Sequence, residues 1–311
     1  QNLLKDAVEE KKLDGVVVAA CSPTLHESTF RNAIEEAGLN EYQCEIANIR
    51  EQCSWVHEEG IAATHKARII IQSSIEKLKL NEPLTPISAD VTRKAMVIGG
   101  GIAGIQAALD IADAGYEVIM VEKKPSIGGH MIQLSETFPT LDCSQCILTP
   151  KMVQLAKHEN ITLYTNSEVE SVEGYIGNFE VKIAQEALHV DPDKCNMCND
   201  CIDACPVVVP NEQEEGLSWR KAIYIPFPQA IPATYTLDID NCLGLDPIAC
   251  GKCRAECEAE AINYDAKPTV IEEKVGAVIV ATGFDLYPVE NLAEYGYGRY
   301  PDVITSLQFE R

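Results

Sequence analysis

Cysteine is the residue type with the clearest chemical pattern in this sequence of 311 residues. Of its 13 cysteines, eight lie between residues 195 and 257. The first four of these follow the spacing C-x₂-C-x₂-C-x₃-C and precede a proline: Cys195, Cys198, Cys201, Cys205 and Pro206. Such a run is typical of a loop that gives three thiolates to one [4Fe–4S] cluster, while the fourth cysteine reaches a second cluster. The pattern therefore predicts an iron–sulfur module.

The other four cysteines of this segment form a looser set: Cys242, Cys250, Cys253 and Cys257. Seven residues separate the first two, and Glu258 stands where a proline is expected. The C-x₂-C-x₃-C spacing that follows is intact, so we expect a wider loop around a second cluster. Pairing across the two sets predicts one cluster on Cys195, Cys198, Cys201 and Cys257 and the other on Cys205, Cys242, Cys250 and Cys253. A zinc site is the alternative, which the absence of histidine among these residues disfavours.

A glycine-rich turn offers the second chemical pattern. Residues 96–104 have the sequence MVIGGGIAG, in which Gly99, Gly101 and Gly104 fit G-x-G-x-x-G between an apolar strand and an alanine-rich helix. Such a turn lets the pyrophosphate of a dinucleotide approach the backbone at the start of a helix. Glu122 ends the next expected strand, where a carboxylate can hold the ribose hydroxyls. This order of elements favours a dinucleotide site over the alternative, a purely structural turn.

Two further segments favour FAD over NAD as the dinucleotide. Gly128-Gly129 and the late sequence AVIVATG, residues 277–283, resemble segments of the two-dinucleotide flavoproteins. In those families the second segment returns the chain to the FAD domain, and no nicotinamide site is visible here. The resemblance implies a thioredoxin-reductase-like FAD domain of α/β class. Its expected cofactor contacts are Gly99, Gly101, Ala103, Gly104, Glu122, Lys123, Gly128, Gly129, Ala281, Thr282 and Gly283.

Four of the remaining cysteines suit a third site. Cys21 and Cys53 each follow an expected strand, at the sheet edge where ligands gather. Cys143 and Cys146 form C-x₂-C in an expected loop, before a helix opened by Thr149-Pro150. We favour a third [4Fe–4S] cluster on these four thiols, because Cys21 and Cys53 otherwise have no role. The alternative is that Cys143 and Cys146 form a dithiol that exchanges electrons with the flavin.

The elements that must position these residues fall into four segments. Residues 1–90 predict a small α/β domain, with Cys44 in its core, that ends in the proline-containing linker NEPLTPISAD. Residues 91–188 predict the first part of the FAD-binding domain. Residues 189–268 are rich in Cys, Pro and Asp and predict an inserted ferredoxin-like α+β module with two clusters. Residues 269–311 return to the FAD domain, which we expect to be incomplete.

Composition disfavours several classes of protein. The 25 Lys and Arg residues against 48 Asp and Glu give a net charge of −23, which disfavours nucleic-acid binding. No apolar run approaches the roughly 18 residues of a membrane helix, and the opening QNLLKDAVEE shows no secretory signal. Clustered cysteines without an export signal indicate metal ligation rather than disulfides, so we expect a cytoplasmic protein. The missing initiator Met suggests an excerpt of a longer chain.

The chain resembles the A-subunit family of the heterodisulfide reductases over essentially its whole length. The segments that carry the resemblance are VVVAACSPTLHESTF, NIREQCSWVH, TFPTLDCSQCILTPKM, RKAIYIPFPQAIP and CLGLDPIACGKCRAEC. The last of these contains the long gap after Cys242, which we interpret as a family trait. The resemblance implies an oxidoreductase subunit that carries FAD and [4Fe–4S] clusters in an electron-transfer complex of anaerobes.

The resemblance further implies flavin-based electron bifurcation or its reverse, confurcation. A two-electron donor would be split at FAD between a low-potential ferredoxin and a higher-potential acceptor such as a disulfide. The implied partners are other subunits of such a complex, a hydrogenase or formate dehydrogenase donor module, and ferredoxin, with a homodimer as an open question. Two other functions stay open: a self-contained NAD(P)H-dependent disulfide reductase that uses Cys143 and Cys146, and an assembly scaffold with structural clusters. No arrangement of residues supports hydrolytic chemistry, and no catalytic residue is identified.

Overall fold

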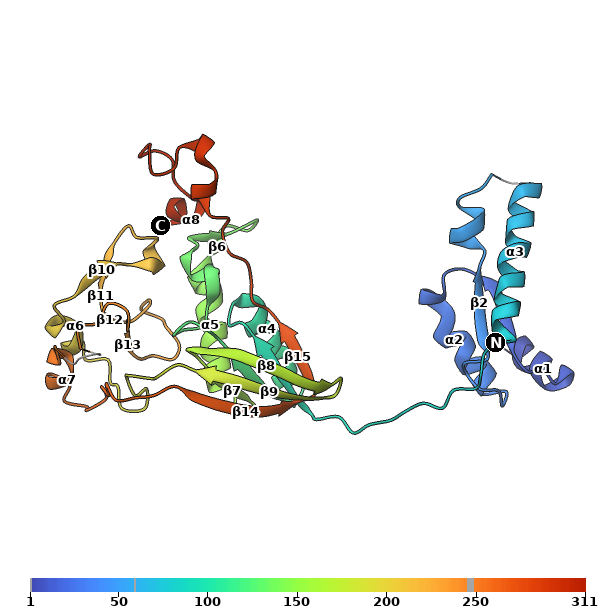
Figure 1. Cartoon of the computed structure of the whole chain (residues 1–311), viewed down its shortest axis with the longest axis horizontal. Coiled ribbons are helices and arrows are strands. Elements are labelled where there is room, and N and C mark those ends of the chain that lie inside the picture. The colour runs from blue at the N-terminus through green and yellow to red at the C-terminus, as the bar shows by residue number, and fades with distance from the viewer. Residues whose placement is uncertain (1, 59, 245–248) are drawn as a thin grey trace. The chain divides into compact units, whose positions relative to one another are not determined.

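The computed structural model describes residues 2–58, 60–244 and 249–311 (Figure 1). The chain divides into two compact units, Gln1–Ser88 and Ala89–Arg311. The division falls in the proline-containing segment 81–90, which forms neither helix nor strand. None of the helices in the described residues is both long enough and apolar enough to pass through a lipid bilayer.

The first unit is a small α/β fold around one parallel pair of strands. These are β1 (Val16–Ala20) and β2 (Cys44–Asn48), with Val16 opposite Cys44. The α-helices in the described part of this unit are α1 (Asn2–Lys11), α2 (Pro23–Glu35) and α3 (Ile61–Leu78). Val8, Val16, Ile34 and Cys44 pack together in its core. The expected core position of Cys44 is confirmed, since the residue is 2% exposed.

A four-stranded parallel sheet of order β15-β3-β4-β7 forms the centre of the second unit. Its strands are β3 (Lys94–Ile98), β4 (Glu117–Val121), β7 (Ile161–Tyr164) and β15 (Ala277–Val280). All neighbouring strands in this sheet run parallel. The carboxyl ends of β15, β3 and β4 therefore meet at one edge, which is where parallel sheets bind ligands.

Both faces of this sheet are covered. Val97 and Met120 pack with residues of α4 (Ile102–Asp113) and α5 (Ser144–Lys157). Their neighbours Met96 and Val121 point to the opposite face and pack against a second sheet. Figure 1 shows the two helices on one side of the parallel sheet and the second sheet on the other. Burial on both faces explains why β3 and β4 are apolar beyond their first residues.

The second sheet is antiparallel, with the order β14-β9-β8. Its strands are β8 (Ser167–Tyr175), β9 (Asn178–Gln185) and β14 (Thr269–Val275). Gln185 at the end of β9 pairs with Thr269 at the start of β14. The cysteine-rich segment is therefore inserted between two strands that are hydrogen-bonded neighbours. The local sequence pattern did not predict this sheet, although it anchors the insert.

The insert is a small α+β module. Its elements are α6 (Asp200–Ala204), β10 (Val208–Pro210), β11 (Trp219–Lys221), β12 (Ile223–Tyr224), β13 (Thr236–Leu237) and α7 (Lys252–Ala255). β10 pairs with β11 and β12 with β13, both antiparallel. Cys201, Cys205 and Cys253 are part of its core, together with Ile223, Tyr235 and Tyr264. Further short elements of the unit include β5 (Glu136–Thr137), β6 (Asp142–Cys143) and α8 (Ser306–Glu310).

The segment around Cys143 and Cys146 corrects one expectation from the sequence. We expected a loop here and a helix opened by Thr149-Pro150, but α5 begins at Ser144, with Cys143 as its N-cap and Pro150 inside the helix. A proline in a helix interior costs about 3 kcal/mol. Burial of residues such as Leu148 in the core offsets this cost. Cys146 therefore lies in the first turn of a helix.

Candidate functional site

The glycine turn lies at the carboxyl end of β3, and its glycines differ in their surroundings. Gly99 has a φ of +105°, and a Cβ there would collide with the carbonyl oxygen of Ala281. A Cβ on Gly104 would collide with the carbonyl oxygen of Gly99, so glycine lets α4 approach the turn. At Gly101 the backbone is extended, with φ −76° and ψ 178°, and a Cβ would meet nothing within 4 Å. The open space at Gly101 fits an approaching pyrophosphate.

The carboxylate of Glu122 lies against the same turn. Glu122 is 7% exposed. Its Oε2 accepts a hydrogen bond from the backbone N–H of Gly100 at 2.6 Å, and its Oε1 accepts one from the N–H of Lys124 at 2.8 Å. Each oxygen keeps acceptor capacity for a further donor such as a ribose hydroxyl. Ala103 and Lys123, which were also expected to contact the cofactor, are exposed at this edge.

The second glycine pair and the return turn join this edge. Gly128 forms a parallel bridge with Gly101, and its N–H donates to the carbonyl of Gly100 at 2.6 Å. The N–H of Ala281 donates to the carbonyl of Ile98 at 2.8 Å. Thr282 and Gly283 follow directly, and Gly283 has a φ of +75°. Three segments that are distant in sequence thus converge where a dinucleotide would bind.

A contact that the sequence did not predict holds two of these segments together. The imidazole of His130 stacks on the ring of Phe284 with a centroid distance of 5.0 Å, and Nε2 of His130 donates to the Phe284 carbonyl at 2.9 Å. The side-chain amide of Gln133 donates to the carbonyl of Gln213 and to Oε1 of Glu215 in the insert. No local pattern could reveal the first contact, because its partners are 154 positions apart.

One hollow in the insert is lined by four cysteines, Cys195, Cys198, Cys201 and Cys257. The N–H of Ala261 donates to Sγ of Cys257 at 3.4 Å. Burial and the neighbouring charges of Cys195, Cys253 and Cys198 raise the pKa of Cys201 to about 12. Thiols packed this closely ionise together only when a cationic centre compensates their charge, which is the situation of metal ligands.

The second cysteine set gathers beside the first. Cys242 packs against the core of the insert, which contains Cys205 and Cys253. Burial raises the pKa of Cys242, as do the charges of Cys253, Cys205 and Cys250. The N–H of Gly244 donates to Sγ of Cys242 at 3.3 Å, and the hydroxyl of Tyr264 lies 2.8 Å from Sγ of Cys253. The expected wide loop between Cys242 and Cys250 includes residues 245–248, which lie outside the described residues.

Each set offers four thiols, which is the number of ligands that a [4Fe–4S] cluster takes. Among the described residues, no three His, Cys, Asp or Glu side chains converge on a position for one metal ion. A zinc site would need its thiolates about 2.3 Å from one centre. A [4Fe–4S] cluster takes one thiolate at each of four iron corners, so its cysteines surround a larger group.

Cys143 and Cys146 form an exposed pair at the start of α5. A hydrogen bond from the Cys146 side chain lowers the pKa of Cys143, and the same contact raises the pKa of Cys146. Cys143 is therefore the more readily ionised thiol of the two. A thiolate beside a thiol suits both roles that the sequence left open, a cluster ligand and a redox dithiol.

Cys21 and Cys53 lie in the first unit, past the carboxyl ends of β1 and β2. Cys21 directly follows β1, with a guanidinium nitrogen of Arg50 at 3.6 Å from its Sγ. Cys53 lies in a π-helical turn, Arg50–Ser54, is 3% exposed and donates to the carbonyl of Ala63 at 3.1 Å. Because the structure describes the two units separately, a third cluster that combines these cysteines with the α5 pair stays a prediction.

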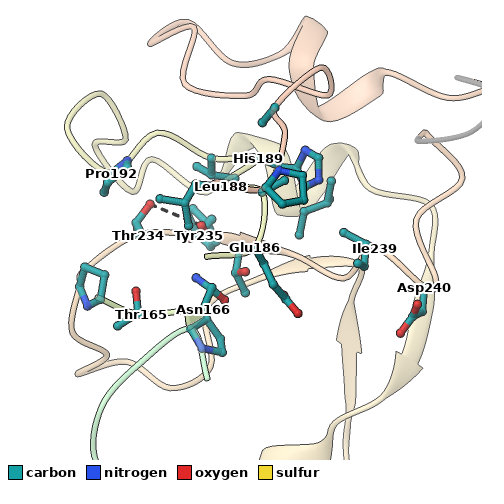
Figure 2. A pocket seen from close by; sticks show the side chains of 18 residues that line it. Thr165, Asn166, Glu186, Leu188, His189, Pro192, Thr234, Tyr235, Ile239 and Asp240 are labelled. Atoms are coloured by element: carbon teal, nitrogen blue, oxygen red, sulfur yellow. Dashed lines mark hydrogen bonds between the residues drawn. The ribbon is translucent and has the colours of Figure 1, made fainter. Parts of the chain in front are cut away.

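An open cleft of about 570 Å³ lies where the insert meets the second unit's two sheets (Figure 2). Thr165 and Glu186 line it from the side of the sheets, and Asp240 lines it from the insert. Tyr235 and Val190 line both this cleft and the hollow of the first cysteine set. The first set therefore lies next to the boundary between the insert and the rest of the unit.

Comparisons with known proteins support both the FAD-binding domain and the iron–sulfur module. Residues 95–187 match the family described as FAD-dependent oxidoreductase, and residues 188–210 match the 4Fe–4S binding domain. These matches, with the mixed α/β structure, confirm the predicted fold class of an FAD domain with a ferredoxin module. A solved thioredoxin reductase from T. acidophilum covers 30% of this chain and 31% of its own, with 20% identity and a TM-score of 0.26.

Curated relatives match the chain over its whole length. It is 54% identical to the second iron–sulfur A subunit of the CoB–CoM heterodisulfide reductase of Methanopyrus kandleri, over 100% of this chain and 47% of that protein. It is 52% identical to the A subunit of the H₂:CoB-CoM heterodisulfide,ferredoxin reductase of Methanothermobacter thermautotrophicus, over 98% of this chain and 46% of that protein. The chain thus spans about half the length of the curated relatives it matches.

Proposed function

We propose that this chain, which belongs to the A-subunit family of the heterodisulfide reductases, forms the FAD- and [4Fe–4S]-binding part of an electron-transferring oxidoreductase. One observation carries the proposal. Three FAD-type segments converge at one sheet edge, and two four-cysteine sets are inserted between β9 and β14 of the same unit. A flavin and clusters in one compact unit are suited to electron exchange between them.

The residues of this chain would bind and orient the flavin nucleotide. The open backbone at Gly101 and the start of α4 would receive the pyrophosphate, because exposed N–H groups at a helix start favour anions. Glu122 would accept a hydrogen bond from the ribose while its backbone donors hold it in place. The bound FAD would supply the ability to take up two electrons together and release them singly.

The two cysteine sets would hold one cluster each. We assign Cys195, Cys198, Cys201 and Cys257 to the first cluster and Cys205, Cys242, Cys250 and Cys253 to the second. Cys201 and Cys253 are both buried in the one core of the insert, so the two sets are neighbours. Since the first set borders the rest of the unit, electrons would pass between the flavin and the first cluster and then to the second.

For the whole protein we propose flavin-based bifurcation or its reverse. The Methanothermobacter relative carries both a heterodisulfide and ferredoxin in its name, and a Methanosarcina acetivorans relative, 47% identical over 100% of this chain and 39% of that protein, is named ferredoxin/F420H2-dependent. A two-electron donor would give one electron to a ferredoxin and one toward a disulfide. Two such donations, with two protons, reduce one disulfide to two thiols. A hydrogenase or formate dehydrogenase module is the proposed donor.

Anaerobic purification with cofactor analysis tests the proposed function. We expect about one FAD per chain and about eight iron atoms on the insert, with about four more if a third cluster forms. Reduction of the flavin should reduce the clusters in a potentiometric titration followed by low-temperature EPR. Clusters that never exchange electrons with the flavin would favour the scaffold. Rapid flavin reduction by NAD(P)H alone, together with reduction of an added disulfide that is lost on alkylation of Cys143 and Cys146, would favour the disulfide reductase.

A further inference from the structure

The second cysteine set contains a hydrogen bond from a buried side chain to a ligand sulfur. Tyr264 is 7% exposed, and its hydroxyl lies 2.8 Å from Sγ of Cys253. A cysteine that binds iron does so as a thiolate and has no proton to donate. A tyrosine hydroxyl, with an ordinary pKa of about 10, keeps its proton at neutral pH. In the cluster-bound protein Tyr264 is therefore the donor and Cys253 the acceptor.

Two neighbouring groups lie against the ring of Tyr264. The guanidinium carbon of Arg254 lies 5.0 Å from the ring centroid. On Gly244, an added Cβ would lie only 3.2 Å from the ring, so the backbone there passes close to the tyrosine. The N–H of Gly244 also donates to Cys242. Two sulfurs of the second set thus accept hydrogen bonds, and a positive charge lies nearby.

The first cysteine set has a buried tyrosine too, but its hydroxyl is engaged elsewhere. Tyr235 is 3% exposed and lines the hollow of the first set, yet its hydroxyl donates to Oδ1 of Asn199 and not to a sulfur. The first set also accepts a backbone hydrogen bond, from the N–H of Ala261 to Sγ of Cys257 at 3.4 Å, but no side-chain hydroxyl in the described residues donates to its sulfurs. Carboxylates stand beside this set as well, because Asp200 and Asp203 line one open hollow with Glu256 and Glu258 on either side of Cys257. Negative charge beside a cluster opposes the addition of an electron.

From this contrast we propose that Tyr264 is a positioning residue that makes the second cluster easier to reduce than the first. The inference rests on the proposed function, since it requires both clusters. Hydrogen bonds to cluster sulfurs stabilise the reduced, more negative state and raise the reduction potential. One electron leaves the first cluster, which is oxidised, and enters the second, which is reduced. No proton moves, because Tyr264 keeps its hydroxyl hydrogen. Electrons that arrive from the flavin side are thereby drawn outward.

The test compares Tyr264→Phe with Tyr235→Phe in the full chain, purified anaerobically with its cofactors. Each variant removes one buried hydroxyl from the insert. Potentiometric titration followed by EPR should show that Tyr264→Phe moves the higher-potential insert cluster to a more negative potential and leaves the other in place. Tyr235→Phe should leave the higher-potential signal unmoved. Unchanged iron and FAD contents establish that both variants are loaded.

A second substitution keeps the ring and changes only the strength of the donor. Site-specific 3-fluorotyrosine at position 264 has a more acidic hydroxyl and should shift the same signal in the positive direction. The 3-fluorotyrosine protein tests the inference even if Tyr264→Phe loses iron. Loaded variants with unmoved potentials, or a shift of the lower-potential cluster, would overturn the inference. If the wild-type protein contained no FAD, or fewer than two clusters on the insert, the proposed function itself would be wrong.

Discussion

At the scale of single residues, Gly101 allows the flavin site to be tested without straining the backbone. Its φ and ψ, −76° and 178°, are open to any residue, and the space beside it is empty of protein atoms. We therefore expect Gly101→Val to fold and to lose FAD, with affinity reduced at least about tenfold, or about 1.4 kcal/mol. The flavin-to-protein absorbance ratio after gel filtration measures the loss, and an unchanged iron content of the insert shows that the unit is folded.

Gly104 supplies the contrasting control, because a Cβ there would collide with the carbonyl of Gly99. Gly104→Val should impair folding itself, which circular dichroism and solubility would reveal. A folded Gly101→Val protein that keeps all of its FAD would show that the turn is only structural. The sequence pattern could point to the glycines of this turn, since their spacing between a strand and a helix is a local signal. It could not predict the donor to Cys253, because the contact of Tyr264 depends on tertiary packing.

At the scale of elements, Arg220 on β11 joins the hairpin of the insert to two carboxylates. Its guanidinium lies 2.6 Å from Glu212 and 2.9 Å from Asp238, and it covers the ring of Tyr224 at 3.8 Å. Burial alone would raise the pKa of Asp238, but hydrogen bonds from Asn241 and Arg220 outweigh it and lower that pKa. The pair therefore contributes stability above the ordinary Asp pKa of about 4, and this is lost as pH falls through the lowered folded value.

Arg220→Met should destabilise the insert by about 1–3 kcal/mol at neutral pH, because it leaves the Asp238 carboxylate without its cationic partner. The deficit should shrink as the pH is lowered, since the wild-type protein then loses the same pair. Denaturant titrations of the cofactor-loaded protein between neutral and acidic pH measure both effects. Lys182→Met is a matched control, because its pairing with Glu272 at 3.6 Å is solvent-exposed and worth about 0–1 kcal/mol. A deficit that is constant with pH would contradict the assignment.

The elements also show which local patterns are informative. β4 was expected as a strand that leads to Glu122, and the observed strand ends one residue earlier, at Val121. This strand could be predicted because a strand buried on both faces is a continuous apolar run. β8, β9 and β14 were not predicted, because their residues are partly exposed and form strands through backbone pairing within this sheet, in which β14 pairs with the distant β9. The predicted start of α5 was wrong, because Pro150 was interpreted as a residue of the first helical turn and it lies inside the helix. In that helix the packing of apolar residues outweighs the local preference of proline.

At the scale of the whole molecule, the net charge of −23 should lower the potentials of the clusters. Carboxylates are also concentrated locally, since Asp200, Asp203, Glu256 and Glu258 line one open hollow beside α6 and α7. Salt screens such charges within about 10 Å at 0.1 M ionic strength. We therefore expect both insert clusters to become easier to reduce as salt is raised. EPR-monitored redox titrations at low and high KCl measure the two potentials, and sucrose serves as an uncharged control. Potentials that stay fixed or fall as KCl is raised would contradict this expectation.

The remaining question for the whole chain is what Cys143 and Cys146 do. We propose that they bind a third cluster together with Cys21 and Cys53, which also have no other assigned role. A Cys143→Ser/Cys146→Ser variant should then lose one EPR signal and about four iron atoms while the two coupled insert signals persist. Serine keeps the size and polarity at the start of α5, so the flavin site next to that helix should stay loaded. The opposite outcome is equally definite. If every cluster signal survives and only a thiol-titratable two-electron step disappears, the pair is a redox dithiol, because a dithiol and its disulfide differ by two electrons.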